Sequence, residues 1–323
     1  MEELFETSFA HLDYRCVALY NASCSADFRL NYSNLILFLF ISVMSVLTVC
    51  GNMVVIASIA AFKQLHTPTN FIIFSLAVSD FLVGAFVMPM QSLMTLDMCL
   101  QQMKSLCPMF HFISSIVGSV SLCNIVFAAI DHYFALWNPF LYTAKVTKKT
   151  MQICISCGWI ASILYNVALY IGNSKGERKL VCVLQCAVPG NDTWGLIDIV
   201  FSFTLPCAVI ISLYLLILRV ALRHARAIST MQKTVSEKRK SFRNSQLKAS
   251  KTLGIVVLVY VVCWIPGYTT LINLENLPDP TLSITSMLCL FYSHSCMNPF
   301  IYAISYPWFK KSLKLFFTLH KLA

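Results

Sequence analysis

The chain has 323 residues, of which 58% are hydrophobic and only 12% are charged, and its mean hydropathy is +0.71. This composition excludes a water-soluble globular domain and predicts a protein that folds within a lipid bilayer. A spanning helix needs about 20 mostly apolar residues, and in chain order the stretches that qualify are 35–60, 70–94, 105–136, 151–172, 194–219, 252–273 and 282–304. We therefore predict an all-α membrane protein: a seven-transmembrane helix bundle over residues 34–305, between an N-terminal segment, 1–33, and a C-terminal segment, 306–323.

The segments between the spans predict how the protein sits in the membrane. Residues 1–33 are polar and lack an apolar core, so we expect no cleavable signal peptide and insertion through the first helix. Most of the 24 lysine and arginine residues follow the first, third, fifth and seventh spans, and such basic segments stay in the cytoplasm. We therefore expect an extracellular N-terminus at the plasma membrane. The net charge of +10 then meets inner-leaflet lipid and a protein partner, and does not indicate nucleic acid.

The segments predicted to lie outside carry the marks of an oxidising compartment. Three sequons fall there and predict glycosylation at Asn21, Asn31 and Asn191. An even set of cysteines also lies there and predicts disulfide bonds: Cys16, Cys24, Cys99, Cys107, Cys182 and Cys186. The remaining cysteines lie in apolar helices, where we expect them to serve as packing residues.

The last apolar stretch contains the motif Asn298-Pro299-x-x-Tyr302, which places a proline and an amide within the membrane. Such groups are tolerated there only where neighbouring helices or water satisfy the freed polar atoms. In this setting the motif resembles that of the rhodopsin-like G-protein-coupled receptors.

The resemblance extends along the chain. Residues 295–309 are similar to the signature of the trace amine-associated receptors, with His294 at the position where that family has asparagine. Residues 63–70, after the first span, and residues 251–255, entering the sixth, resemble the same family. A short C-terminal amphipathic helix at about 307–318 completes the expected fold, with Trp308 and Phe309 facing lipid and the lysines meeting the headgroups.

This resemblance implies partners and covalent bonds. Receptors of this family signal through a heterotrimeric G protein, here expected to be of the stimulatory class, and most branches serve olfaction. The resemblance also implies that Cys107 pairs with Cys186 in the second outer loop, and that Cys182 pairs with either Cys16 or Cys24. The rival classes need features that the sequence does not offer. A membrane enzyme needs a nucleophile–base pair or a metal cluster, and a transporter needs internal repeats.

One carboxylate lies in the middle of the second span, at Asp80. Ionisable groups are costly in lipid, which indicates a functional residue. One interpretation is a protonated carboxyl group hydrogen-bonded to the last helix. The resemblance implies instead an allosteric sodium ion, the only cofactor expected, held by Asp80, Ser121, Ser295 and Asn298. Oxygen ligands suit such a hard cation, although His294 replaces an oxygen donor that is usual there.

The predicted ligand site departs from that of other amine receptors. Receptors for biogenic amines hold the ligand ammonium with an aspartate in the third helix, and its position here is occupied by Ser114. The fifth span instead carries one acid, Asp198, eight residues before Pro206. This arrangement resembles a fish-type subset of the trace amine-associated receptors, so we predict that Asp198 binds the ammonium of a small amine. Two alternatives stay open: Asp198 is solvated at the lipid–water boundary, or it binds a polar ligand that is not an amine.

Other residues complete the predicted cavity. The resemblance places a set of hydroxyl and aromatic side chains around the ligand, where rings attract a cation: Ser114, Ser115, Trp264, Tyr268 and Tyr292. Acids near the outer mouth are candidates for the distal charge of a diamine: Asp97, Glu275 and Asp279.

The end of the third span carries Asp131-His132-Tyr133 where the family has Asp-Arg-Tyr. A histidine is only partly protonated near neutral pH, whereas arginine is permanently charged. We therefore expect either weak G-protein activation or activation through other contacts. The remaining residues of the expected activation switch match the family: Trp264, Pro266, Asn298, Pro299 and Tyr302.

Overall fold

The computed structural model describes residues 32–96, 106–175, 179–183, 186–190, 192–230, 252, 254–266, 280–305 and 308–310. Several predictions fall outside these ranges and stay predictions. They concern the glycosylation sites, one ring of the cavity, the acids of the outer mouth and three of the cysteines: Asn21, Asn31, Asn191, Tyr268, Asp97, Glu275, Asp279, Cys16, Cys24 and Cys99. Of the expected C-terminal helix, residues 308–310 are described, and they are helical.

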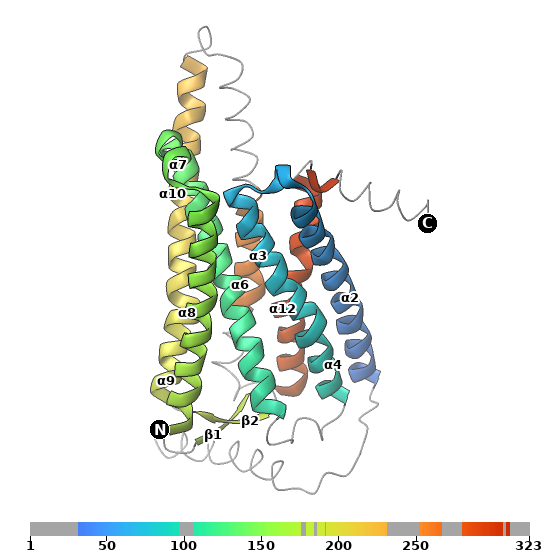
Figure 1. The fold of residues 1–323 in the computed structure, drawn as a ribbon. Coiled ribbons are helices and arrows are strands. Elements are labelled where there is room, and N and C mark those ends of the chain that lie inside the picture. Colours follow the sequence, from blue (N-terminus) through green and yellow to red (C-terminus); the bar gives the residue numbers. More distant parts are fainter. Residues whose placement is uncertain are drawn as a thin grey trace, which may run out of the picture.

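Long helices run side by side through the described chain (Figure 1). In chain order they are α2 (Tyr32–Ala61), α3 (Pro68–Leu82), α4 (Met88–Leu96), α6 (Leu106–Trp137), α8 (Lys148–Lys175), α9 (Asp192–Asp198), α10 (Leu205–Thr230) and α12 (Pro280–Ser305). Among the described residues, five stretches are long and apolar enough to cross a membrane: Leu35–Ala61, Pro68–Met94, Leu106–Trp137, Lys148–Lys175 and Thr193–Val220. The other two predicted spans are the apolar helix Gly254–Pro266 and α12.

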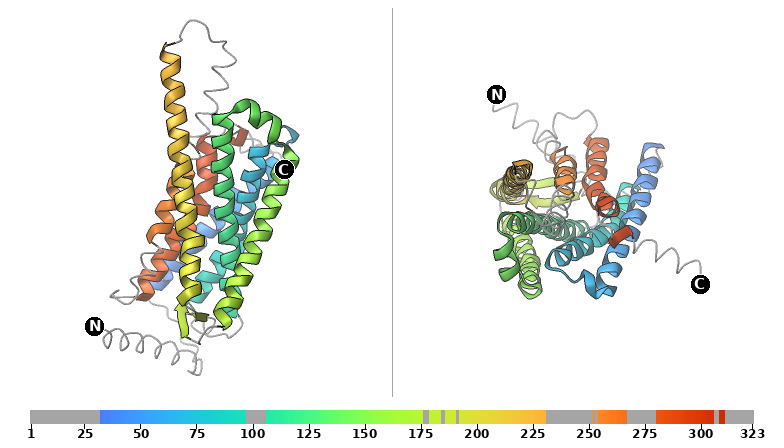
Figure 2. Two further views of the ribbon diagram at one scale, coloured as in Figure 1. Left: turned by 90° about the vertical axis from the view of Figure 1, so that its left-hand side faces the viewer. Right: turned by 90° about the horizontal axis from the view of Figure 1, so that it is seen from above.

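The predicted helix bundle is therefore confirmed, with one change of extent. α10 continues to Thr230, beyond the predicted end of the fifth span, because a helix can extend past the membrane once its residues are polar. Seen from above, α2 and α10 lie on opposite sides of the bundle (Figure 2). α6 packs against α3, α8 and α10, so it forms the centre of the assembly.

A short antiparallel hairpin was not predicted. It consists of β1 (Lys179–Val183) and β2 (Cys186–Gly190), paired so that Cys182 faces Ala187 and Val183 faces Cys186. β2 contacts α6 and α8. We call this the hairpin end of the bundle. The other end carries the short helix α7 (Pro139–Lys145) and the single turn η1 (Lys63–Leu65) (Figure 1).

Two helices at the α7 end begin with the same local device. The side chain of Thr67 accepts a hydrogen bond from the Asn70 amide, and Pro68 is the first residue of α3. Asn138 does the same for the amide of Leu141, and α7 begins at a proline. A polar cap satisfies amides that have no partner within the helix, and proline costs nothing at the first position, so both starts are fixed locally.

Two helices contain a π-helical turn, in which the backbone bonds span five residues instead of four. The turn η2 (Val83–Val87) joins α3 to α4, and η3 (Ile199–Thr204) joins α9 to α10. In η3 the amide of Leu205 bonds to the carbonyl of Val200. Such turns are rare and often lie at functional sites. η3 begins directly after Asp198.

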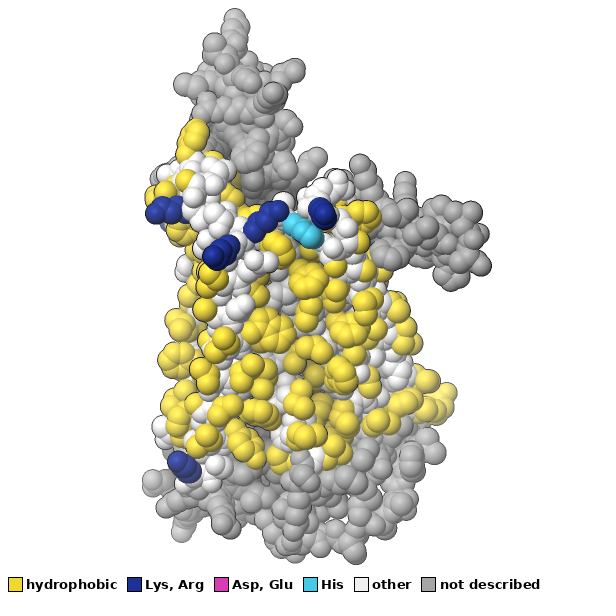
Figure 3. Space-filling model, in the orientation of Figure 1, with side chains coloured by type: hydrophobic (Ala, Val, Ile, Leu, Met, Phe, Trp, Pro, Cys, Tyr) yellow, Lys and Arg dark blue, Asp and Glu magenta, His cyan; other side chains and the backbone are white. Residues whose placement is uncertain are grey.

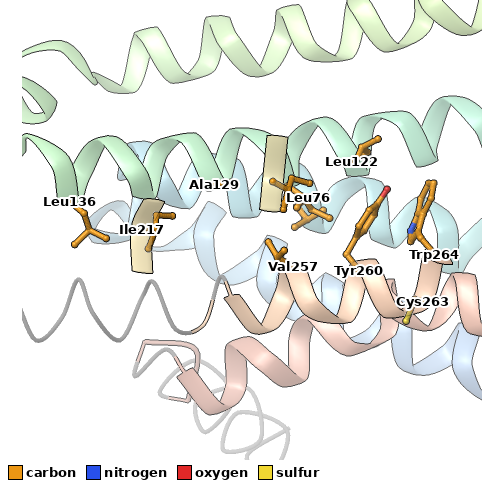
Figure 4. Packing of buried hydrophobic residues seen from close by; sticks show 11 residues of the cluster. Leu76, Leu122, Ala129, Leu136, Ile217, Val257, Tyr260, Cys263 and Trp264 are labelled. Atoms are coloured by element: carbon orange, nitrogen blue, oxygen red, sulfur yellow. The ribbon is translucent and has the colours of Figure 1, made fainter. Parts of the chain in front are cut away.

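Apolar side chains fill the bundle in clusters. One cluster joins α6, α10 and the helix Gly254–Pro266, and Figure 4 shows Tyr260 and Trp264 pointing toward the helix that carries Leu122. A second cluster joins α2, α3 and α12 and includes Phe309, which is 2% exposed. The prediction that Phe309 faces lipid is therefore wrong. Its ring packs among the side chains of this cluster, so protein and not lipid surrounds it.

The surface matches a membrane setting. Hydrophobic side chains cover the middle of the face seen in Figure 3, while lysine and arginine side chains gather toward the α7 end. Many large apolar side chains of α2, α8 and α10 are exposed. A contiguous apolar surface of this kind is unfavourable in water and marks a contact with another apolar phase, here the bilayer.

Candidate functional site

Asp198 is the last residue of α9, at the hairpin end, and is half-buried. Its Oδ1 accepts hydrogen bonds from Ser202 Oγ at 2.5 Å and from Tyr165 Oη at 3.0 Å. The two hydroxyl oxygens lie 3.2 Å apart. Ser202 belongs to η3 and Tyr165 to α8, so the carboxylate is anchored toward the fourth span. Within the described ranges no cationic side chain pairs with Asp198, and no donor contacts its Oδ2.

Ser114 and Tyr292 meet across the gap between α6 and α12. The hydroxyl group of Ser114 lies close to the phenol of Tyr292, and Tyr292 is buried. The position at which other amine receptors carry an aspartate is therefore used for a neutral contact between two helices. Ser115 is exposed, and its carbonyl accepts a hydrogen bond from Ser119 Oγ at 2.8 Å. No hydrogen bond in the described part joins this group to Asp198.

Trp264 lies at the centre of an aromatic group. Its ring centroid is 4.3 Å from that of Phe291, 4.7 Å from that of Tyr260 and 6.1 Å from that of His294. These rings come from two helices, Gly254–Pro266 and α12. The predicted switch tryptophan is thus packed directly against the seventh span, so a change in its rotamer must displace rings on α12.

Asp80 is fully buried and has both carboxylate oxygens occupied. Ser295 Oγ donates to Oδ1 at 2.7 Å and Ser121 Oγ donates to the same oxygen at 3.5 Å. Asn298 Nδ2 donates to Oδ2 at 2.7 Å. All four predicted residues of the sodium site therefore meet at one point, contributed by α3, α6 and α12.

His294 links this carboxylate cluster to the aromatic group. Its Nδ1 bonds to the Phe291 carbonyl, and its Nε2 lies 3.2 Å from Ser295 Oγ. A carbonyl only accepts, so Nδ1 carries a proton. The histidine thus contacts Trp264 on one side and the partner of Asp80 on the other.

The donor set can be tested against the implied sodium ion. Sodium favours oxygen ligands, and the cluster offers the carboxylate of Asp80 with the hydroxyl groups of Ser121 and Ser295. A further buried oxygen, Asn52 Oδ1, has no hydrogen-bond partner in the described part, while Asn52 Nδ2 donates to the Ser295 carbonyl. The oxygens present therefore fit a hard cation, and the cluster also contains nitrogens from Asn298, Asn52 and His294.

At the α7 end, Asp131 is buried and both of its oxygens are also occupied. Thr69 Oγ1 donates to Oδ2 at 2.7 Å, and Tyr142 Oη donates to Oδ1 at 2.8 Å. Burial, followed by the negative charge of Asp131, raises the pKa of Tyr142 above its ordinary value. The phenol consequently stays a donor, and Asp131 binds α3 and α7 through hydrogen bonds, while its charge also acts on the neighbouring His132.

His132 is buried beside a small hollow of about 30 Å³ at the α7 end. The hollow is lined mainly by apolar side chains from four spans, with His132, Thr69, Thr252 and Tyr302 among them. Two residues of the predicted switch, His132 and Tyr302, therefore share one cavity. Tyr133 instead lies parallel to Trp137, with centroids 6.3 Å apart, and does not line this hollow.

The two prolines of the predicted switch lie where the sequence places them. Pro266 is the last described residue of its helix, and Pro299 lies inside α12. α2 approaches Pro299 so closely that a Cβ on Gly51 would come within 2.9 Å of the proline ring. Glycine is therefore required at this crossing.

Cys107 is buried at the start of α6 and is disulfide-bonded. The side chains of Cys182 and Cys186 are not described, so the pairing of Cys107 with Cys186 stays a prediction. So does a bond from Cys182 to Cys16 or Cys24. Eight cysteines of the described helices are free. Cys263 and Cys296 are buried, as expected for packing residues, whereas Cys50, Cys154 and Cys157 are exposed.

The two partners of Asp198 were not predicted from the sequence. Ser202 follows Asp198 by four residues, a spacing that brings side chains together on one helix face, so this signal was available. Tyr165 lies on another helix, and nothing in the local sequence indicates its contact. Tyr142 was missed for the same reason, although the Asn138-Pro139 start of its helix was legible.

Seven packed helices, a buried carboxylate cluster between the second, third and seventh, and aromatic rings against a proline-bearing helix define a membrane receptor of the seven-helix class. The family described as 7 transmembrane receptor (rhodopsin family) matches residues 51–302.

Relatives narrow this class. Trace amine-associated receptor 13c of Danio rerio is 32% identical over 318 residues, covering 94% of this chain and 92% of that protein. Trace amine-associated receptor 6 of Homo sapiens is 34% identical over 321 residues, covering 94% and 91%. Trace amine-associated receptor 5 of Rattus norvegicus is 34% identical over 303 residues, covering 91% and 88%. The chain belongs to the trace amine-associated receptors, and it is a G-protein-coupled receptor and not an enzyme.

Proposed function

We propose that this receptor binds a small cationic amine and that Asp198 holds the ligand ammonium. The proposal rests on the incomplete hydrogen bonding of this carboxylate. It lies half-buried in an apolar helix, one oxygen accepts two hydroxyl donors, and the other meets no donor from the described residues. A carboxylate withdrawn from water without a cationic partner is costly, so a ligand cation that completes the pair gains the interaction.

The surroundings support an amine as well. Ser114 is neutral and lies beside Tyr292, so the third span supplies no competing charge at this position. The relatives of this chain are named for trace amines. Rings at Trp264 and Tyr292 contribute further attraction for a cation lying within about 6 Å of them.

Membership of the family is the basis for the proposed location, G protein and physiological role. The receptor lies in the plasma membrane with its N-terminus outside, passes the signal through a heterotrimeric G protein of the stimulatory class, and serves olfaction. A sodium ion at Asp80, Ser121, Ser295 and Asn298 acts as an allosteric partner. The oxygen-rich donor set of that cluster supports this part of the proposal.

The test is the substitution Asp198→Asn, which keeps the size and removes the charge. Loss of one partner of a desolvated ion pair costs about 3–5 kcal/mol, which lowers amine potency more than about a hundredfold. The measurement is cAMP accumulation in cells exposed to a panel of mono- and diamines, at matched surface expression. Asp192→Asn, in the first turn of α9, is the matched control. An unchanged dose–response curve would refute the anchoring role.

A pH series separates an amine from a neutral polar ligand. If the receptor binds the cation, the potency of an amine falls as the pH of the medium rises through the pKa of that amine, because the charged form disappears. Potency that follows total amine, whatever its charge, identifies a receptor for a neutral group. Reading each amine against its own pKa keeps general effects of pH on the cells apart from ligand charge.

A further inference from the structure

The anchoring carboxylate is held in a closed triangle of polar atoms. Tyr165 Oη and Ser202 Oγ both reach Oδ1 of Asp198, at 3.0 Å and 2.5 Å, and are 3.2 Å from each other. The three groups come from two elements: α8 supplies the phenol, and the fifth span supplies the other two. The wide turn η3 begins directly after the aspartate and carries the serine.

The acceptor capacity of this carboxylate is unequally divided. A carboxylate oxygen offers about two lone-pair sites, and both sites of Oδ1 are taken by hydroxyl donors. Each hydroxyl group has one proton, so the protons that Tyr165 and Ser202 give to Asp198 are the only ones they have. What remains for a ligand is Oδ2, which no described residue contacts.

We propose that Tyr165 and Ser202 are specificity-determining residues that make Asp198 a one-oxygen acceptor, selective for ammonium over guanidinium and amidinium ligands. This inference rests on the function proposed above. An ammonium group is a compact charge with rotatable donors and needs one acceptor oxygen. A guanidinium group is a planar fork that binds best through two parallel bonds to both oxygens of a carboxylate. With Oδ1 occupied, the fork loses one of its two bonds, whereas the ammonium loses nothing.

The test uses pairs of ligands that share a carbon skeleton and differ only in the cationic group: phenethylamine with phenethylguanidine, and butylamine with butylguanidine. Each is assayed by cAMP accumulation on the full-length receptor and on three variants, Tyr165→Phe, Ser202→Ala and the double variant. The control is Tyr170→Phe, the same change on the same helix, at a ring that packs against Phe112. Surface expression is measured throughout.

The wild type is expected to favour the amine of each pair. The double variant frees Oδ1, so the amine-to-guanidine potency ratio falls about tenfold, the size expected for one regained charge-assisted bond. Ser202→Thr keeps the hydroxyl group and retains the wild-type ratio. A general loss of structure lowers both potencies together and leaves the ratio unchanged, so the ratio reports specificity.

The outcomes separate the two proposals. An unchanged ratio in a well-expressed double variant overturns the one-oxygen inference, even where Asp198→Asn abolishes responses and the anchoring role stands. If the double variant fails to reach the surface, the two single variants decide, each with a smaller fall expected. The proposed function itself is overturned if the wild type responds to neither the amines nor the guanidines, or if the Asp198→Asn variant responds to both.

Discussion

Two carboxylates within the same bundle differ in how far the protein satisfies them. Asp80 is 0% exposed, and donors from α6 and α12 occupy both of its oxygens. Asp198 is half-buried, and the described residues occupy one oxygen only. A buried polar group costs least when all its bonds are made. The satisfied acid therefore holds helices together, whereas the half-satisfied acid remains available to a partner from outside.

Asp131 extends the comparison to the α7 end. Thr69 and Tyr142 donate hydrogen bonds to its two oxygens. Both oxygens of Asp131 are therefore occupied, as they are in Asp80, although Asp131 lies beside His132. Of these three acids, Asp198 alone has an oxygen without a donor among the described residues.

The largest effect is expected at the satisfied acid. Asp80→Ala leaves the donors of Ser121, Ser295 and Asn298 buried without an acceptor, and stability falls by about 3–5 kcal/mol. Thermal unfolding of the detergent-purified receptor measures this. Asp80→Asn, which keeps one acceptor oxygen, is the milder control, and Asp198→Asn is expected to leave the melting temperature unchanged. A melting temperature lowered equally at both positions would erase the distinction between the two carboxylates.

Adding a second half-satisfied acid sharpens the comparison. Ser114→Asp adds a charge on α6, so diamine potency is expected to rise by about tenfold or more, and monoamine potency by less. The readout is cAMP across alkyl diamines of increasing length. Ser115→Asp, one residue along on an exposed position, is the matched control. No gain for any amine would show that Ser114 does not reach the ligand.

The third prediction concerns the α7 end. With Asp131 already bonded to two hydroxyl groups, an arginine at position 132 stays available to the cavity, and its permanent charge replaces a fractional one. His132→Arg is therefore expected to raise basal or evoked cAMP by about threefold at matched surface expression. His66→Arg in the first loop controls for added charge at this end. A fall in signalling would instead mark His132 as a residue adapted to coupling.

The smallest effect is expected at His294, which links the Asp80 cluster to the aromatic group around Trp264. His294→Asn replaces the nitrogen beside Ser295 by an amide that brings an oxygen donor. The response to exchanging sodium for potassium in the medium, at constant ionic strength, is expected to grow about twofold in agonist potency. Asp80→Asn in the same background removes the charge and abolishes the ion effect. An ion response that His294→Asn leaves unaltered excludes this position from the cation site.

Much of the fold could be predicted because lipid imposes a simple rule. A span must be long and apolar, and the seven stretches therefore stand out from the sequence alone. A polar cap followed by proline likewise marks the helix starts at Pro68 and Pro139 in the sequence. The π-helical turns could not be predicted from the sequence. Such a turn depends on how the helix packs against its neighbours, and no characteristic residue composition marks it.

The candidate site divides in the same way. The members of the Asp80 cluster could be named from the family resemblance, and the structure brings all four together. Asp198 could be found as a lone acid in an apolar helix, but its partner Tyr165 is 33 positions away. Contacts of this kind arise only when two helices pack, which no periodicity encodes. Phe309 was misplaced for the same reason.

The turn η3 also determines how this receptor responds to changes in length. Each residue of an α-helix rotates the chain by about 100°. Deleting one residue from Ile199–Thr204 would convert the wide turn into an ordinary one and swing the preceding part of the helix, Asp198 included, through about that angle. Pro206 and the rest of α10 would stay in place. A single-codon deletion here would therefore re-aim the carboxylate away from Tyr165 without replacing either Asp198 or Tyr165.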